Sequence, residues 1–187
     1  LPSIGAVSRF SLQSRASQKD AAWMINVEGG VVKSPTPTSH LCGTTAVVRD
    51  LFYATPARLK FLRTERTESQ RIIEAVKRIA MSHPEVGFRL TVDGQPRLRY
   101  IAGKGEPVSI RLARLKAVMG AEFAENALSI DAQKTGMQVT GFAGVPTFNR
   151  ANGAMQYLFV NNRPVVDRLL VGAVRGSYAD FLARNRH

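Results

Sequence analysis

The sequence predicts an α+β fold in which antiparallel strands and separate helices form two domains. Short runs with alternating apolar residues predict strands in two regions, one near the start of the chain and one after Pro84. A long helical pattern separates the two regions, because apolar residues recur at helical spacing from Ile72 to Ala80 and Pro84 then ends the pattern. We therefore expect a first domain at residues 1–84 and a second at residues 85–187.

The composition is typical of a soluble globular protein. Of the 187 residues, 44% are hydrophobic and 21% are charged, and no apolar run approaches the ~18 residues of a transmembrane helix. Cys42 is the single cysteine, which excludes an internal disulfide and suits the cytoplasm. His40 lies close to Cys42, but two further ligands at a plausible spacing are lacking. We expect a cytoplasmic protein without a metal site or a membrane segment.

The charge indicates a polyanionic partner. Lysine and arginine number 26 and aspartate and glutamate 14, which gives a net charge of +12. Division at Pro84 leaves +6 on each side, so the excess is not confined to a tail. Lysine and arginine side chains that neutralise phosphates release condensed counterions, which favours nucleic acid as the partner. A basic protein without such a partner is the alternative that charge alone leaves open.

In the first domain, alternating residues predict strands and helical spacing predicts helices. Thr55 and Pro56 have the residue types of an N-cap and a first helical position. Thr67 and Gln70 resemble a capping box before the long helix. Phe52, Tyr53 and Phe61 are expected to pack the short helix onto the sheet. The sequence predicts strands at 8–14, 22–27, 31–33 and 44–51, a loop at 33–40, and helices at 56–62 and from 67 to 82.

The second domain begins with a hairpin signal. Asp93-Gly94 is typical of a type I′ turn, and Gly120 stands where a helix would end. Asp167 can cap the last helix, whose apolar stripe includes Leu169, Leu170 and Phe181. The sequence predicts strands at 86–92, 97–101, 127–131, 137–144, 155–161 and 163–166, with helices at 108–119 and 168–184.

One stretch of sequence carries a family signature. Gly43-Thr44-Thr45 opens a β-branched strand, and Asp-Leu-Phe-Tyr-Ala-Thr-Pro-Ala-Arg-Leu-Lys-Phe-Leu follows from Asp50 to Leu62. This order of elements resembles the MutL family of DNA mismatch-repair proteins. Residues 1–10 and 157–170 are also similar to segments of that family, so the resemblance spans most of the chain.

The resemblance implies an ATP site and a specific pair of domains. Residues 1–84 would be the C-terminal part of a GHKL-type ATPase domain, an α/β sandwich, and residues 85–187 a ribosomal protein S5 domain 2-like domain that lacks its C-terminal end. Gly43, Thr44 and Thr45 would be one wall of the site for ATP and Mg²⁺. The family's catalytic glutamate, magnesium-binding asparagine and lid motifs do not occur in this sequence. We therefore assign no catalytic or metal-binding residue, and expect the chain alone to bind neither ATP nor Mg²⁺ stably and to hydrolyse no ATP.

The resemblance also implies a DNA-binding residue. Asn162-Arg163, followed by Arg168, matches the family's Asn-x-Arg segment, although the family commonly has glycine at the position of Asn162. Arg163 is the first candidate for contact with DNA phosphates, which would bind DNA largely without regard to sequence. The further candidates are Arg168, Arg150, Arg175 and Lys134.

The predicted function is that of a mismatch-repair factor that couples mismatch recognition to downstream strand nicking and unwinding. The resemblance implies four kinds of partner: DNA, a MutS-type mismatch sensor, the endonuclease and helicase of mismatch repair, and a second copy on ATP binding. Two alternatives remain open. One is a basic nucleic-acid-binding module without nucleotide chemistry, and the other is another GHKL member such as a type II topoisomerase ATPase subunit.

Overall fold

A computed structural model describes residues 1–183 and 186 of the chain, and its contacts divide into two units, Leu1–Thr64 and Glu65–His187. The long helix α3 (Glu65–Ser82) contacts four elements that all follow it in the chain. They are β6 (Phe88–Val92), β7 (Gln95–Tyr100), α4 (Pro107–Met119) and β11 (Arg163–Val165). It therefore belongs to the second unit by its contacts, whereas the predicted boundary lies at its C-terminal end. The two predicted domains, residues 1–84 and 85–187, therefore remain a prediction.

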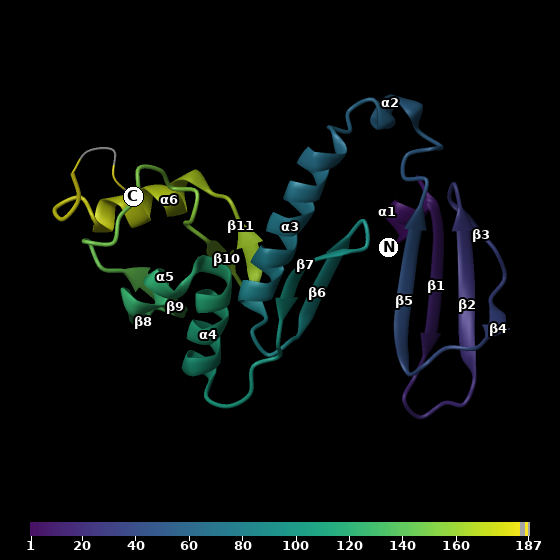
Figure 1. Cartoon of the computed structure of the whole chain (residues 1–187), viewed down its shortest axis with the longest axis horizontal. Coiled ribbons are helices and arrows are strands. Elements are labelled where there is room, and N and C mark those ends of the chain that lie inside the picture. Colours follow the sequence, from purple (N-terminus) through teal and green to yellow (C-terminus); the bar gives the residue numbers. More distant parts are fainter. Residues whose placement is uncertain (184–185, 187) are drawn as a thin grey trace. The chain divides into compact units, whose positions relative to one another are not determined.

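The first unit is built on one antiparallel sheet (Figure 1). Its strands run in the order β3-β2-β1-β5, with β4 also paired to β2, so β5 lies at an edge of the sheet. Pro37 lies in β4, inside the predicted loop, because an outer strand can accept a proline that donates no hydrogen bond. The elements of the sheet and the short helix before it are α1 (Pro2–Gly5), β1 (Arg9–Arg15), β2 (Ala22–Glu28), β3 (Val31–Val32), β4 (Thr36–Thr38) and β5 (Gly43–Arg49).

The helix α1 packs against one face of this sheet. A Cβ atom on Gly5 would lie 3.1 Å from Val27 Cγ1, so the helix approaches β2 closely. Phe10, on the same face as Val27, is buried. The fully buried Ser8 hydroxyl donates a hydrogen bond to the Ile4 carbonyl oxygen at 2.7 Å, which holds the helix end to the start of β1.

The segment after β5 departs from the prediction. The helix α2 (Pro56–Leu59) ends three residues before the predicted Leu62. Thr55 does not cap it, since its side chain accepts no cap hydrogen bond and its Oγ1 is buried without a partner. A helix of one turn also offers little surface for packing, and Phe61, expected to pack against the sheet, is 81% exposed.

The second unit begins with α3 and the hairpin of β6 (Phe88–Val92) and β7 (Gln95–Tyr100). Asp93 and Gly94 both have positive φ, which confirms the predicted primed turn. The helix α3 begins at Glu65, two residues before the predicted capping box. Its predicted apolar stripe is only partly covered, because Ala80 is fully buried whereas Ile72 is 51% exposed.

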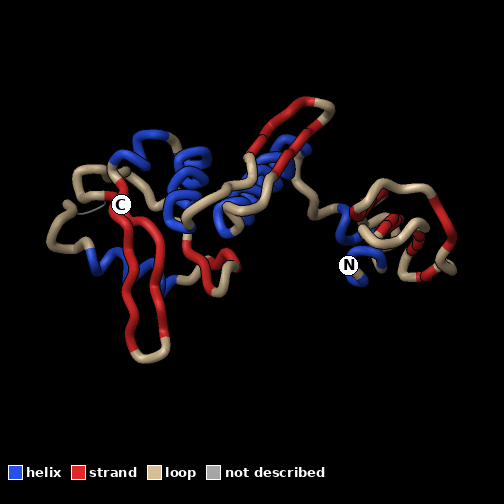
Figure 2. Tube along the Cα trace, turned by 90° about the horizontal axis from the view of Figure 1, so that it is seen from below, coloured by secondary structure: helices blue, strands red, loops and turns tan. Residues whose placement is uncertain are grey.

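The rest of the second unit forms further hairpins and helices. The strands of this unit pair two by two and do not join into one sheet, and Figure 2 shows them in red as separate hairpins. Asp167 accepts hydrogen bonds from Leu169 N and Leu170 N, as predicted, but the helix it caps ends at Ser177. Residue 184, the predicted end of that helix, lies outside the described residues. The elements are α4 (Pro107–Met119), α5 (Ala121–Glu125), β8 (Ala127–Lys134), β9 (Met137–Gly144), β10 (Leu158–Val160), β11 (Arg163–Val165) and α6 (Arg168–Ser177).

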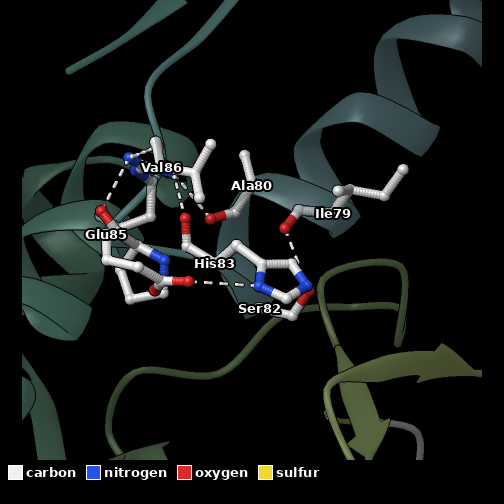
Figure 3. Close-up of polar contacts among 8 residues, drawn as sticks. Ile79, Ala80, Ser82, His83, Glu85 and Val86 are labelled. Atoms are coloured by element: carbon white, nitrogen blue, oxygen red, sulfur yellow. Dashed lines mark hydrogen bonds and ion pairs between the residues drawn. The ribbon is translucent and has the colours of Figure 1, made fainter. Parts of the chain in front are cut away.

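A buried arginine holds the centre of the second unit together. Arg114, on α4, is 4% exposed, and its guanidinium lies over the aromatic rings of Phe88 and Tyr100. Burial lowers the pKa of its guanidinium. Among the described residues, no carboxylate lies within ion-pair distance of Arg114. It donates instead to backbone carbonyls of the last turn of α3, of the segment that follows α3, and of Ile101 after β7; Figure 3 labels Ala80, His83 and Val86 among these acceptors. These acceptors are Ala80 at 2.7 Å, His83 at 3.2 Å, Pro84 at 3.1 Å, Val86 at 2.8 Å and Ile101 at 2.9 Å.

Candidate nucleotide wall and nucleic-acid interface

The predicted ATP-site residues open the edge strand β5, where Gly43 pairs with Arg15 of β1. Gly43 has φ of 131°, and an added Cβ atom would meet no atom within 4 Å. The glycine is therefore needed for its backbone conformation and not for space. The open space beside it is compatible with a ligand that approaches the strand closely.

The two threonines point to opposite faces of the sheet, since successive strand residues alternate. Thr44 pairs with Ser14 of β1, and their hydroxyl oxygens lie 2.8 Å apart. Thr45 pairs with Gln13 and therefore lies on the other face. Only one of the two threonine side chains can face a ligand bound on a given face of the sheet.

A histidine holds the second threonine. His40 Nδ1 contacts the Leu41 carbonyl oxygen, and His40 Nε2 lies 2.7 Å from Thr45 Oγ1. A carbonyl oxygen only accepts, so Nδ1 carries the hydrogen, and in the neutral ring Nε2 accepts the hydrogen bond from the Thr45 hydroxyl. Thr45 therefore ties the segment before β5 to the strand. The sequence suggests His40 only as a possible metal ligand, and it does not predict the contact of His40 with Thr45.

The first threonine belongs to a row of three side chains across three strands. Trp23 of β2 and Thr44 of β5 both lie directly opposite Ser14 of β1, so the three share one face. A recess of about 550 Å³ adjoins the row and is lined by both Ser14 and Trp23. Trp23 is 52% exposed. The sequence did not identify Ser14 as a site residue. Pairing the predicted strand 8–14 with the predicted strand 44–51 would have placed Ser14 beside Thr44.

Among the described residues, no group of three or more histidine, cysteine, aspartate or glutamate side chains could hold a metal ion. The Mg²⁺ that the resemblance implies therefore has no assigned ligand in this chain.

The signature after Gly43-Thr44-Thr45 has a structural role in this unit. Asp50 and Phe52 adopt positive φ of 51° and 69°, which L-residues rarely adopt. Arg9 pairs with Asp50 at 3.2 Å and stacks over the Tyr53 ring, with its Cζ 5.2 Å from the ring centroid. The Phe52 N–H donates to the Val7 carbonyl oxygen at 2.7 Å. These contacts fix the turn that joins β5 to α2.

The five predicted DNA-binding side chains are exposed and lie on the second unit. Arg163 begins β11, directly after the turn at Asn161 and Asn162. Arg168 and Arg175 lie on α6, seven residues apart, which places them on one side of the helix. Arg163, Arg168 and Arg175 thus come from two consecutive elements.

The two remaining candidates differ from these three. Arg150 stacks over the Phe148 ring, and its guanidinium lies 3.9 Å from Glu122. The nearby carboxylate reduces the positive potential that Arg150 offers to a phosphate. Lys134 ends β8, beside the turn at Thr135 and Gly136.

No described helix is long and apolar enough to cross a lipid bilayer.

A family model, relatives in sequence and solved structures all match this chain to mismatch-repair proteins. The model of the DNA mismatch repair protein, C-terminal domain, matches residues 115–187. The DNA mismatch repair protein MutL of Paramagnetospirillum magneticum is 52% identical over 187 residues, and MutL of Phenylobacterium zucineum is 55% identical over 195 residues. Both matches cover 100% of this chain and 31% of the relative. The chain thus spans about a third of the length of these relatives.

Solved structures share the fold. The Aquifex aeolicus MutL ATPase domain complexed with ADP matches with a TM-score of 0.73 and 29% identity, over 93% of this chain and 65% of that one. The N-terminal domain of a DNA repair protein matches with a TM-score of 0.75 over 97% of this chain, at 21% identity, and supports the fold alone. The expected fold class is confirmed by the Aquifex aeolicus structure. The chain belongs to the MutL family of DNA mismatch repair proteins.

Proposed function

We propose that this chain is the part of a mismatch-repair MutL that joins an ATP-binding wall to a DNA-binding surface. The observation that carries the proposal is the 52% identity to a MutL over all 187 residues, with the Gly43-Thr44-Thr45 motif at the start of a strand. In the whole protein, ATP binding would couple mismatch recognition to downstream strand nicking and unwinding.

The nucleotide would lie on the face of the first sheet that carries Thr44. The Aquifex aeolicus relative is a complex with ADP, and a recess lined by Ser14 and Trp23 adjoins the row of side chains that includes Thr44. Mg²⁺ and the general base would be supplied by family motifs that this sequence does not contain. The chain alone would therefore bind neither ATP nor Mg²⁺ stably and would hydrolyse no ATP.

The DNA-binding surface would be centred on Arg163, with Arg168 and Arg175 beside it. Arginine side chains bind phosphates, so the contact would hold DNA without reading its sequence. Such binding suits a factor that must act near any mismatch. The other partners would be a MutS-type mismatch sensor, the endonuclease and helicase of mismatch repair, and a second copy of the protein in the ATP-bound state. The protein would act in the cytoplasm.

The DNA proposal is tested by charge reversal at Arg163. We expect Arg163→Glu to weaken binding of a duplex oligonucleotide by roughly tenfold or more and to lower the dependence of log K on log salt by about one. Arg99→Glu is the matched control, since Arg99 is also an exposed strand arginine of the second unit. Fluorescence anisotropy over a salt series measures both quantities, and equal, small effects of the two variants would contradict the assignment.

The nucleotide proposal is tested in the full-length gene product that carries this sequence. Thr44→Val keeps the side-chain shape and removes the hydroxyl, so we expect it to weaken ADP binding in calorimetry. A full-length protein that binds DNA but no ADP or ATP would favour the alternative of a basic module without nucleotide chemistry. The topoisomerase alternative is disfavoured by the MutL relatives and by the Asp50 to Leu62 signature.

A further inference from the structure

We propose that Ser14 is a positioning residue for the nucleotide and that it acts by orienting the Thr44 hydroxyl. The inference rests on the proposed nucleotide site and adds a residue that lies outside the Gly43-Thr44-Thr45 motif. It also assigns the two threonines different roles, with Thr44 at the ligand and Thr45 as a structural tether.

The position of Ser14 is fixed by two strands. Ser14 lies directly opposite Trp23 on one side, in the last pair of the β1–β2 ladder, and opposite Thr44 on the other. Side chains at directly opposed positions of antiparallel strands are close neighbours on one face. Ser14 is half-buried, whereas Thr44 at the edge strand is exposed. The serine therefore supports the threonine from the inner side of the sheet.

The hydroxyl hydrogen of Ser14 can point to either of two acceptors, the Gly43 carbonyl oxygen or Thr44 Oγ1. Ser14 Oγ lies 2.8 Å from Thr44 Oγ1 and 3.3 Å from the Gly43 carbonyl oxygen. When Ser14 donates to the Gly43 carbonyl, the Thr44 hydroxyl donates to Ser14 and presents lone pairs outward. When Ser14 donates to Thr44 instead, the Thr44 hydrogen is available to a ligand acceptor. The pair can thus meet either a donor or an acceptor of the nucleotide.

The Ser14 and Thr44 side chains lie on one face of the sheet, and only a ligand on that face can contact both hydroxyls. The recess of about 550 Å³ is lined by Ser14 and Trp23, which stand in the same row as Thr44. Thr45 lies on the other face, and His40 Nε2 contacts its hydroxyl at 2.7 Å. Thr44 does not itself line the recess, so a ligand would have to extend from the recess along the row, past Ser14, to reach the Thr44 hydroxyl. Such a ligand would not meet Thr45, which lies on the other face.

The experiment measures ADP affinity of the full-length gene product by calorimetry, with thermal unfolding of each variant alongside. We expect Ser14→Ala to raise the Kd about fivefold, because the Thr44 hydroxyl loses its partner, and to leave the unfolding temperature nearly unchanged. Ser14→Thr keeps the hydroxyl and should restore wild-type affinity. A purely structural serine would instead show parallel losses of stability and affinity that Ser14→Thr need not reverse.

Ser11→Ala is the matched control, since Ser11 is a half-buried serine of the same strand whose side chain lies on the other face. We expect it to leave the Kd unchanged. Wild-type affinity in Ser14→Ala, together with a loss in Thr44→Val, would overturn this inference and keep the proposed site. Wild-type affinity in Thr44→Val as well, or no ADP binding by the full-length protein, would overturn both the inference and the proposed site.

Discussion

At the scale of single residues, Glu106 and Asp167 act as helix caps, whereas Thr55, which also stands just before a helix, does not. Glu106 accepts hydrogen bonds from Val108 N at 2.9 Å and Ser109 N at 2.7 Å, and Asp167 caps α6 in the same way. Thr55 makes no such bond before α2. The backbone N–H groups of a first helical turn favour the ionised carboxylate, and they lower the pKa of Glu106.

The Glu106 cap predicts a pH-dependent contribution to stability. A pKa that folding lowers contributes stability above the ordinary value of 4.5, and this contribution is lost as the pH falls through the lowered pKa. We expect Glu106→Gln to unfold at a lower urea concentration than wild type at about pH 7, because the amide accepts more weakly. The difference should shrink as the pH falls below 4.5.

Urea unfolding followed by circular dichroism at several pH values measures this effect. Glu125→Gln, at an exposed position of the short helix α5, removes a similar charge without a cap and serves as the control. A difference between Glu106→Gln and wild type that stays constant down to acidic pH would show that the cap does not depend on the charge.

The two caps also show what a local pattern can predict. Asp167 was predicted, because aspartate directly before an apolar helical stripe is a strong signal. Glu106 was not, since glutamate is a weaker cap by type and only the structure shows its side chain folded back. Thr55 has the right type and the right position before proline, but the Arg58 N–H donates to the Thr55 carbonyl oxygen at 2.8 Å, and the Thr55 hydroxyl accepts no cap hydrogen bond.

At the scale of elements, the tight turns were predicted better than the lengths of helices and strands. The turns at Asp93-Gly94 and Asn161-Asn162 have positive φ at both residues, as their sequences indicate. Such conformations depend on few atoms, so local sequence determines them. The end of α6 and the strand β4 depend instead on which neighbouring strands and loops pack against them, and sequence periodicity does not contain that information.

The turn before Arg163 gives a prediction at this scale. Asn162 has φ of 62°, a conformation that asparagine tolerates and glycine adopts freely. We expect Asn162→Gly to keep the turn and to change the unfolding free energy by less than about 0.5 kcal/mol. Asn162→Val should lose about 1–2 kcal/mol, because a β-branched side chain is strained there.

Urea unfolding of the three proteins measures these changes. Gln95→Val is the control, since Gln95 is an exposed residue directly after another tight turn and is not among the residues with positive φ. Equal stability of Asn162→Val and wild type would contradict the left-handed conformation. The glycine that the family commonly has at this position would then need another explanation.

At the scale of the whole molecule, the second unit depends on a cation that sequence reasoning would place at the surface. Arginine is rarely buried, so nothing in the helical pattern of α4 distinguishes Arg114 from Arg111. Only the fold brings five carbonyl oxygens to its guanidinium, three of them close to Pro84. The family, by contrast, was predictable, because the Asp50 to Leu62 signature is continuous in sequence.

Arg114→Met should destabilise the second unit selectively. The variant removes the Arg114 donor from five backbone carbonyls, of which those of His83 and Pro84 keep hydrogen bonds from Val86 N and Gly103 N. We expect a loss of about 3 kcal/mol in the unfolding free energy of that unit. The contacts divide the chain into two units, so we expect the first unit to keep its stability. Trp23, the single tryptophan, reports on the first unit by its fluorescence, and circular dichroism of the helices reports mainly on the second.

Arg111→Met is the matched control on the same helix, since Arg111 makes one described hydrogen bond, to Thr140 Oγ1 at 3.0 Å. In urea, Arg114→Met should shift the dichroism midpoint well below that of Arg111→Met and leave the Trp23 midpoint in place. A joint shift of both signals would show that the two units unfold as one cooperative body.

The alternation along β5 also limits how this gene can change. A single codon inserted into or deleted from the start of β5 would shift the pairing of β5 with β1 by one residue and exchange the faces of Thr44 and Thr45. Thr45, the residue that contacts His40, would then lie on the face of the recess. Changes of two codons would preserve the parity and could be absorbed at the strand ends. Length variation among natural sequences should therefore collect outside this strand, in the hairpin loop between β1 and β2.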